Sequence, residues 1–456
     1  MFIYALNFLF LVQCSSSNEK KKQTAPPIIS GKINQNISCI HFPNEHYAAY
    51  LPSNYTRSKS WPVIYMLDSH GEALTPVEKY KEIAEKYGYI LIASYNSKNG
   101  LILADQNTIL FNLFEDSQNR LNIDKNRVYL AGFSGGARVA TYYALNNPSI
   151  AGVIGCGAGF GEIKNPASEK LNYIGFVGTE DFNYTEFLML QKSLDSLNFK
   201  HQIVYFKGEH AWAPASYMEE AFMWQIANAM RDNKIQKDAK MINAIKKHFD
   251  DSLSVLNKSG NSLKLFKLYK QAINYLDQLV DISEYSKKIA LIKKDKSYLD
   301  ALKNDEQINK SETVLRDKFS HAFETKNIDW WKNEVKQLSA EKNNLLLERN
   351  KRVLNLCSLM AYMYAGKTMN ASQMDVTKKL LQIYELVDPD NSETYYMNAR
   401  WFMLNKQSNE ALSYLEKALF YKFNDIDRLI NDPAFESLKQ NVQFLDVIDK
   451  MKKIKK

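Results

Sequence analysis

The sequence predicts an α/β region built on a mostly parallel sheet, followed by an all-α region. Up to about residue 232, short apolar and β-branched runs alternate with amphipathic runs, the pattern of a parallel sheet covered on both faces. Beyond that point Gly and Pro nearly vanish, and Lys, Leu, Asn and Glu recur at helical spacing. We therefore expect a leading segment at 1–34, an α/β domain at 35–232 and a helical domain at 233–456.

The elements of the α/β region are expected where short apolar or amphipathic runs are bounded by Gly, Pro, Asn or Asp. Strands are expected near residues 36–43, 46–51, 62–68, 89–95, 127–133, 150–156, 172–178 and 201–207. Helices are expected near residues 76–87, 102–120, 135–147, 183–198 and 214–231.

The leading segment resembles an export signal. Residues 1–12 are almost entirely apolar but too short to span a bilayer as a helix. A Ser-rich and Lys-rich tether follows Cys14, so the segment resembles a bacterial lipoprotein signal with Cys14 as the lipidated residue. Gln13 is larger than the small residue usual before that cysteine, and no basic residue precedes the apolar run, so an ordinary signal peptide is the alternative. Both imply export to the periplasm or cell envelope, and the first also implies a lipid anchor in the membrane.

A serine lies at a strand–turn–helix junction near the middle of the α/β region. Gly132-Phe-Ser134-Gly-Gly136 follows the apolar run 127–131 and precedes the helix-forming run 137–145. In this setting Gly-x-Ser-x-Gly is typical of a nucleophile elbow, a strained turn that exposes the serine side chain. The glycines are needed because a Cβ at their positions would collide with the strand or the helix. Ser134 is therefore the candidate nucleophile.

An acid and a histidine follow Ser134 in the order Ser, acid, His. Asp181 and His210 each follow the carboxyl end of an expected strand, where the loops of a parallel sheet converge. In that arrangement His210 would be the general base, and Asp181 would orient its imidazole. Glu180 competes with Asp181 for the acid role, and His201 competes with His210, although His201 lies at the opposite end of its strand. Nothing between residues 134 and 210 is long enough for a large lid, so an open site is expected.

The oxyanion of an acyl-transfer reaction needs backbone N–H donors near the nucleophile. One is expected from Gly135, directly after Ser134, and another from the loop after the first long strand, at Gly71 or Glu72. His70 in that loop could orient the donors or hydrogen-bond the turn, and the sequence leaves both roles open.

Three stretches together resemble secreted serine esterases of the α/β-hydrolase fold, the group of feruloyl-esterase-like, acetyl-xylan-esterase-like and polyhydroxybutyrate-depolymerase-like enzymes. They are Tyr50–Tyr55, Trp61–Gly71 and the loop Gly208–Pro214, which resembles the family's Gly-x-His-x-Trp-Pro with Ala213 inserted. The resemblance covers about residues 35–230. It implies a carboxylic ester hydrolase acting on a small-molecule or polysaccharide-linked ester, with no metal and no organic cofactor.

The charge and the cysteine spacing argue against nucleic-acid binding and against a metal site built from cysteines. The net charge of +8 arises from 59 Lys and Arg against 51 Asp and Glu, and much of the excess lies on polar faces of the second half, so we expect no nucleic-acid binding. Besides Cys14, the cysteines Cys39, Cys156 and Cys357 lie in apolar runs without the spacing of metal ligands.

The helical domain resembles tetratricopeptide domains, best at 358–422. Such repeats are about 34 residues long and pair two helices through small residues. Residues at the packing positions of the better repeat are Tyr395, Ala399, Phe402, Ala411, Leu415 and Ala418. Residues that match more loosely one period earlier are Ala361, Ala365, Leu381, Tyr384 and Pro389, and an earlier hairpin is expected around Ala272, Leu276 and Leu279. A packing scaffold and a groove for a protein partner remain alternatives.

The sequence thus predicts an exported serine esterase whose helical domain binds a partner. The alternatives are a binding or assembly lipoprotein that kept the hydrolase fold without catalysis, and a serine peptidase, because the same triad cleaves amides. Since all candidate catalytic residues precede residue 211, we expect residues 26–232 alone to hydrolyse small esters.

Overall fold

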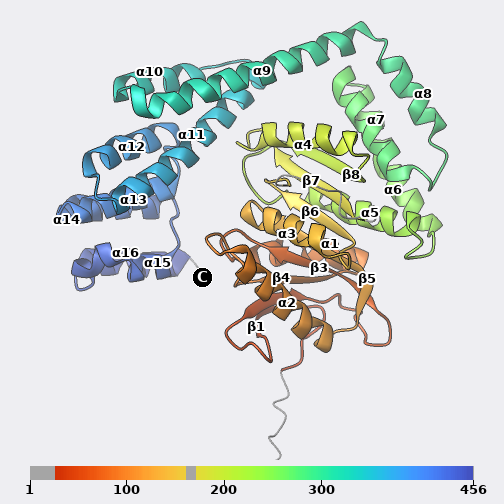
Figure 1. Cartoon of the computed structure of the whole chain (residues 1–456), viewed down its shortest axis with the longest axis horizontal. Coiled ribbons are helices and arrows are strands. Elements are labelled where there is room, and N and C mark those ends of the chain that lie inside the picture. Colours follow the sequence, from red (N-terminus) through yellow and green to blue (C-terminus); the bar gives the residue numbers. More distant parts are fainter. Residues whose placement is uncertain (1–25, 161–170, 455–456) are drawn as a thin grey trace, which may run out of the picture.

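The structure is a computed structural model that describes residues 26–160 and 171–454 (Figure 1). The candidate lipidation residue Cys14 lies outside the described residues. None of the described helices is long and apolar enough to cross a membrane.

The first part of the chain forms one eight-stranded sheet in the order β1-β2-β4-β3-β5-β6-β7-β8. Strands β1 and β2 pair antiparallel, as do β2 and β4, and the remaining neighbours pair parallel. The strands are β1 Ile33–Ser38, β2 His46–Tyr50, β3 Trp61–Leu67, β4 Ile90–Ser94, β5 Ile123–Phe133, β6 Gly152–Cys156, β7 Asn172–Gly178 and β8 His201–Phe206. This mostly parallel sheet confirms the predicted fold class, and all eight expected strands are present. The first begins and ends earlier than expected, because the chain turns at Phe42–Glu45.

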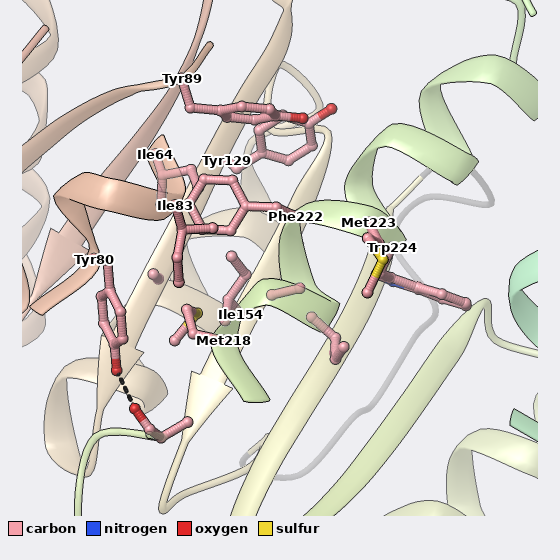
Figure 2. Close-up of a cluster of buried hydrophobic side chains, with 14 of the residues drawn as sticks. Ile64, Tyr80, Ile83, Tyr89, Tyr129, Ile154, Met218, Phe222, Met223 and Trp224 are labelled. Carbon is pink, nitrogen blue, oxygen red and sulfur yellow. Dashed lines mark hydrogen bonds between the residues drawn. The ribbon is translucent and has the colours of Figure 1, made fainter. Parts of the chain in front are cut away.

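Helices cover both faces of the sheet, because alternate residues of each buried strand point to opposite sides. Ile64 and Met66 face the layer of α1 and α5, whereas Val63, Tyr65 and Leu67 face the layer of α2, α3 and α4. The helices of this part are α1 Leu74–Tyr87, α2 Leu103–Arg120, α3 Gly135–Asn146, α4 Tyr184–Ser196 and α5 Ala215–Arg231. Figure 2 shows the first layer, where Phe222 of α5 packs between the aromatic rings of the sheet and Ile83 of α1.

Three further helices extend this layer beyond residue 232. They are α6 Ala239–Asn257, α7 Ser262–Leu276 and α8 Ser283–Ile292. Tyr275 of α7 lies between Trp224 of α5 and Phe249 of α6, with ring centroids 5.1 and 4.9 Å apart. The buried cluster of the sheet therefore continues into these helices, and the expected boundary at 232 falls within one apolar core. Ala272 and Leu276, expected in a repeat-like hairpin, are buried in this core.

The remaining helices, which we call the helical arm (296–454), form a second core. They are α9 Lys296–Thr325, α10 Ile328–Ser339, α11 Asn344–Asn370, α12 Met374–Val387, α13 Ser392–Leu404, α14 Ser408–Phe420, α15 Ile426–Asn431, the 3-10 helix η1 Pro433–Leu438 and α16 Val442–Ile454. The chain beyond residue 232 is thus largely helical, as predicted. In Figure 1, α9 runs past the β7–β8 side of the sheet, and the later helices of the arm follow alongside the sheet and its covering helices.

Candidate active site

Ser134 occupies a sharp turn between β5 and α3. Its φ of 53° and ψ of −120° lie outside the regions favoured by non-glycine residues, and its N–H donates to Cys156 O at 2.8 Å. A Cβ at Gly132 would lie 2.4 Å from Ala137 N, and one at Gly136 would lie 2.0 Å from Leu67 O. Both glycines are therefore required, because only they let the strand, the turn and the helix approach so closely.

Asp181 and His210 are hydrogen-bonded to each other. His210 Nδ1 lies 3.0 Å from Asp181 Oδ1 and 2.9 Å from Oδ2. The Asp181 side chain is 1% exposed and the His210 side chain 18% exposed. Asp181 Oδ1 also accepts from Asn183 N at 2.7 Å, which fixes the carboxylate. Because Nδ1 contacts the carboxylate, Nε2 is the ring nitrogen left to act on a substrate or nucleophile.

Two phenylalanines and a glycine position the His210 ring beside the elbow. The ring packs against Phe133, the residue before Ser134, and against Phe182, the residue after Asp181, with centroids 4.8 and 4.3 Å away. A Cβ at Gly157 would lie 2.9 Å from the Cε1 atom of His210, so this position leaves room for the ring only as glycine. The structure thus brings the three predicted residues to one end of the sheet, after β5, β7 and β8.

The predicted oxyanion donors differ in whether their N–H groups already have a hydrogen-bond acceptor. Within the described chain, the N–H groups of Gly135 and Glu72 have no hydrogen-bond acceptor, whereas Gly71 N donates to Asp68 O at 3.2 Å. Gly71 has a φ of 76°, and a Cβ there would lie 2.6 Å from Tyr95 O, so its role is to let the loop turn. Of the two loop candidates, Glu72 is the one whose N–H is free.

Asn99 is a candidate site residue that the sequence analysis missed. Its Oδ1 atom lies 1.8 Å from where a Cβ of Gly135 would be, so the amide group stands directly beside the elbow. Asn99 N donates to Ser69 O at 2.9 Å, which ties the loop after β4 to the candidate oxyanion loop. An exposed Asn in a Lys-Asn-Gly stretch gives no sequence signal that separates this position from an ordinary turn.

The His loop (207–214) is anchored to the oxyanion loop through Asp68. Trp212 Nε1 donates to Asp68 Oδ2 at 2.7 Å, and His70 N donates to Asp68 Oδ1 at 2.8 Å. Burial alone would raise the pKa of Asp68, but the hydrogen bonds from His70 and Trp212 outweigh it and lower the pKa below its usual value. Tyr80 OH of α1 holds the same loop through Ala213 O at 2.7 Å (Figure 2).

His70 is largely exposed at the mouth of the site. Its contact with the Asp68 carboxylate raises the pKa of His70, with smaller contributions from Glu72 and from Glu393 of α13. The arm also contacts the residue beside Asp181, because Lys351 and Asn355 of α11 bond to the carboxylate and the backbone oxygen of Glu180. The site is therefore bordered by the arm, although it was expected to be open.

The competing residues lie in other environments. The Glu180 carboxylate pairs with Lys351 of α11 at 3.0 Å rather than with His210. His201 Nδ1 contacts Phe199 O at 2.8 Å at the opposite end of β8, and burial lowers its pKa. Burial also raises the pKa of the Cys156 thiol, behind the elbow, to about 12, which keeps it protonated.

Neither the protein-family models nor the curated proteins compared with this sequence gives a match. Solved structures do. S-formylglutathione hydrolase from Staphylococcus aureus is 15% identical with a TM-score of 0.32, and the match covers 40% of this chain and 92% of that one. The feruloyl esterase module from Clostridium thermocellum is 15% identical with a TM-score of 0.36, covering 43% and 89%. Esterase B from Lactobacillus rhamnosis is 12% identical with a TM-score of 0.36, covering 46% and 90%. The α/β-hydrolase fold follows from the strand order and the turn at Ser134 in this chain itself.

Proposed function

We propose that this protein is an exported serine hydrolase that cleaves carboxylic esters through Ser134, His210 and Asp181. The supporting observation is the Asp181–His210 hydrogen bond, with the imidazole packed on Phe133 beside the strained Ser134 turn. A carboxylate fixed on Nδ1 makes Nε2 the proton acceptor, and the turn presents a serine hydroxyl on the same side of the sheet.

In the proposed reaction, Ser134 Oγ attacks the ester carbonyl while its proton moves to His210 Nε2. Asp181 stabilises the imidazolium that forms, and the N–H groups of Gly135 and Glu72 stabilise the oxyanion. His210 then returns the proton to the leaving alcohol, which leaves an acyl-Ser134 intermediate. Water, deprotonated by His210, hydrolyses that intermediate and regenerates the serine.

The test is hydrolysis of short p-nitrophenyl esters by the full chain and by its Ser134→Ala variant. We expect the variant to lose several orders of magnitude in kcat and to unfold at the same temperature as the native chain, because Ser134 makes no side-chain hydrogen bond within the described structure. A fluorophosphonate probe should label the native chain at Ser134 and leave the variant unlabelled. Equal labelling of both proteins would contradict the assignment.

The same assay separates the two alternatives. Cleavage of peptide amides in preference to esters would indicate a serine peptidase. Absence of both activities and of probe labelling would favour a binding or assembly protein with a hydrolase fold.

Export and partner binding are further parts of the proposal. Lipidation of Cys14 would anchor the protein in the cell envelope, and metabolic labelling with a fatty-acid probe, lost in Cys14→Ala, tests this. We also propose that α11 to α14 form tetratricopeptide-like repeats for a protein partner. Met374 and Ser408, which begin α12 and α14, lie one repeat of about 34 residues apart, and Ala365, Ala399 and Ala411 are fully buried between the helices.

A further inference from the structure

The loop that presents Asp181, residues 179–183, is held on one side by the helical arm. We call it the acid loop. Three of its carbonyl oxygens accept hydrogen bonds from side chains of α9 and α11. These bonds run from Arg352 Nη1 to Thr179 O (2.7 Å), from Asn355 Nδ2 to Glu180 O (2.9 Å) and from Arg316 Nη2 to Phe182 O (2.6 Å). The arm thus holds the backbone on both sides of Asp181.

A buried carboxylate orients the two arginines that make these bonds. Glu312 of α9 is fully buried and accepts from Arg316 Nη2 at 2.8 Å and from Arg352 Nε at 2.7 Å. The Arg352 guanidinium, 4% exposed, also lies 4.2 Å from the centre of the Tyr184 ring. Removing both arginine charges from water is costly, and the shared carboxylate, together with the loop carbonyls, compensates that cost. The guanidinium groups are therefore fixed in direction.

The opposite edge of the acid loop is bonded to the hydrolase domain. Thr179 N donates to Phe206 O and Glu180 N donates to Gly208 O, both at 2.8 Å. These acceptors belong to the end of β8 and the start of the His loop. The acid loop therefore lies between its own sheet on one side and the helical arm on the other.

A displacement of the acid loop would disturb two contacts of the His210 ring. Asp181 supplies the carboxylate on His210 Nδ1, and Phe182 supplies one of the two rings that flank the imidazole. A side chain displaced by about 1 Å from the productive geometry can reduce turnover by about 100-fold. The bonds from the arm are thus placed where they control the orientation of the base.

We propose that Arg316, Arg352 and Asn355 are positioning residues that fix the acid loop, so that the helical arm completes the active site. This inference rests on the proposed serine hydrolase function for its catalytic consequence. Its structural content, the dependence of the Asp181–His210 hydrogen bond on the arm, does not need that function.

The test compares Arg352→Met and Asn355→Ala with the control Lys318→Met in the full-length protein. Arg352→Met keeps a long side chain but removes both the bond to Thr179 O and the charge facing Glu312. Asn355→Ala removes a single donor and leaves the buried charges intact, so it serves if Arg352→Met does not fold. Lys318→Met removes a positive charge from α9, but its ion pair is with Glu334 of α10, outside the acid loop.

Two measurements are made on each folded variant. Ester hydrolysis should show kcat lowered about 10-fold to 100-fold in Arg352→Met and less in Asn355→Ala, with KM nearly unchanged, because orientation of the base affects the chemical step. Proton NMR of histidine-labelled protein should show the downfield Nδ1–H resonance of His210 weakened or lost in Arg352→Met. Lys318→Met should match the native chain in both measurements.

Two results would overturn the proposal. One is a native kcat and a native His210 resonance in both folded test variants. The other is the same loss in Lys318→Met, which would indicate a general effect of the arm. If the native chain hydrolyses no ester but Arg352→Met still alters the His210 resonance, the proposed function fails while the positioning role stands.

Discussion

Glu180 and Asp181 are neighbours in the chain, yet the structure gives them opposite surroundings. Asp181 points to His210, and Glu180 points to Lys351 of the helical arm. The sequence favoured Asp181 because it lies at the end of the turn after a strand. It could not predict the partner of Glu180, since that partner is 171 residues away in the chain.

We expect Asp181→Asn to lower kcat by about 10⁴-fold, because an amide cannot stabilise the imidazolium and favours the wrong tautomer of His210. Glu180→Gln should change kcat by less than about fivefold, since its partially exposed ion pair with Lys351 contributes only about 1 kcal/mol or less. Steady-state kinetics on a p-nitrophenyl ester measures both. A larger loss of kcat in Glu180→Gln than in Asp181→Asn would assign the acid role to Glu180 instead of Asp181.

The residues missed by the sequence analysis share one property. Asn99, Phe182 and Gly157 act through contacts between loops that follow different strands. Strand ends can be predicted from apolar runs, and this placed Ser134, Asp181 and His210 at one edge of the sheet. The directions of loop side chains depend on tertiary packing, which the pattern of a single segment does not contain.

At the scale of elements, the sheet was predictable and the partners of the later helices were not. Continuous apolar runs predict buried strands, and all eight strands appear within a few residues of their expected positions. Helix α6 buries Ile242, Ile245, Phe249 and Leu253 at helical spacing. That spacing predicts which face is buried, but it does not say whether the face packs on another repeat or, as here, on the hydrolase domain.

The contact between α5 and α7 contains a carboxyl group with an unusual titration. Burial raises the pKa of Glu220 to about 7, and a hydrogen bond from Gln271 only partly offsets this. The unfolded chain ionises near the ordinary value of 4.5, so between about pH 4.5 and 7 the folded chain holds a proton that the unfolded chain releases. The contribution of Glu220 to the free energy of unfolding therefore falls as the pH rises through that range.

Glu220→Gln should remove this pH dependence, because an amide keeps the acceptor for Gln271 without the charge. We expect it to raise the free energy of unfolding at pH 8 by up to about 3 kcal/mol and to leave it nearly unchanged at pH 4. The control is its neighbour Glu219, whose burial is outweighed by hydrogen bonds from Lys86 and Tyr87, so its pKa is lowered. Glu219→Gln should give no stabilisation at pH 8. Thermal unfolding at both pH values measures the difference, and equal stability of Glu220→Gln and native protein at pH 8 would contradict the prediction.

At the scale of the whole molecule, the composition break at residue 232 is real but does not mark the end of the hydrolase core. Trp224 and Tyr275 lie on opposite sides of it and pack together, and Arg231 donates to Asn274 O at 2.7 Å. The second core begins only in α9. The structure therefore gives a physical reason to revise the expectation that residues 26–232 suffice for activity.

Three chains test this organisation: residues 26–232, residues 26–294 and residues 26–456. The shortest chain exposes the face of α5 that α6 and α7 cover, so we expect it to aggregate or to lose cooperative thermal unfolding. The chain ending at 294 keeps that cover and should unfold cooperatively.

The chain ending at 294 lacks Arg316, Arg352 and Asn355, however, so its kcat on a small ester should be about 10-fold to 100-fold below that of the longest chain. In this chain, three carbonyl oxygens of the acid loop would lose their side-chain donors at once. The amide protons of the loop should therefore exchange faster with solvent. Full activity of residues 26–294 would show that the arm is dispensable for the chemistry, and full activity of residues 26–232 would restore the boundary at the composition break.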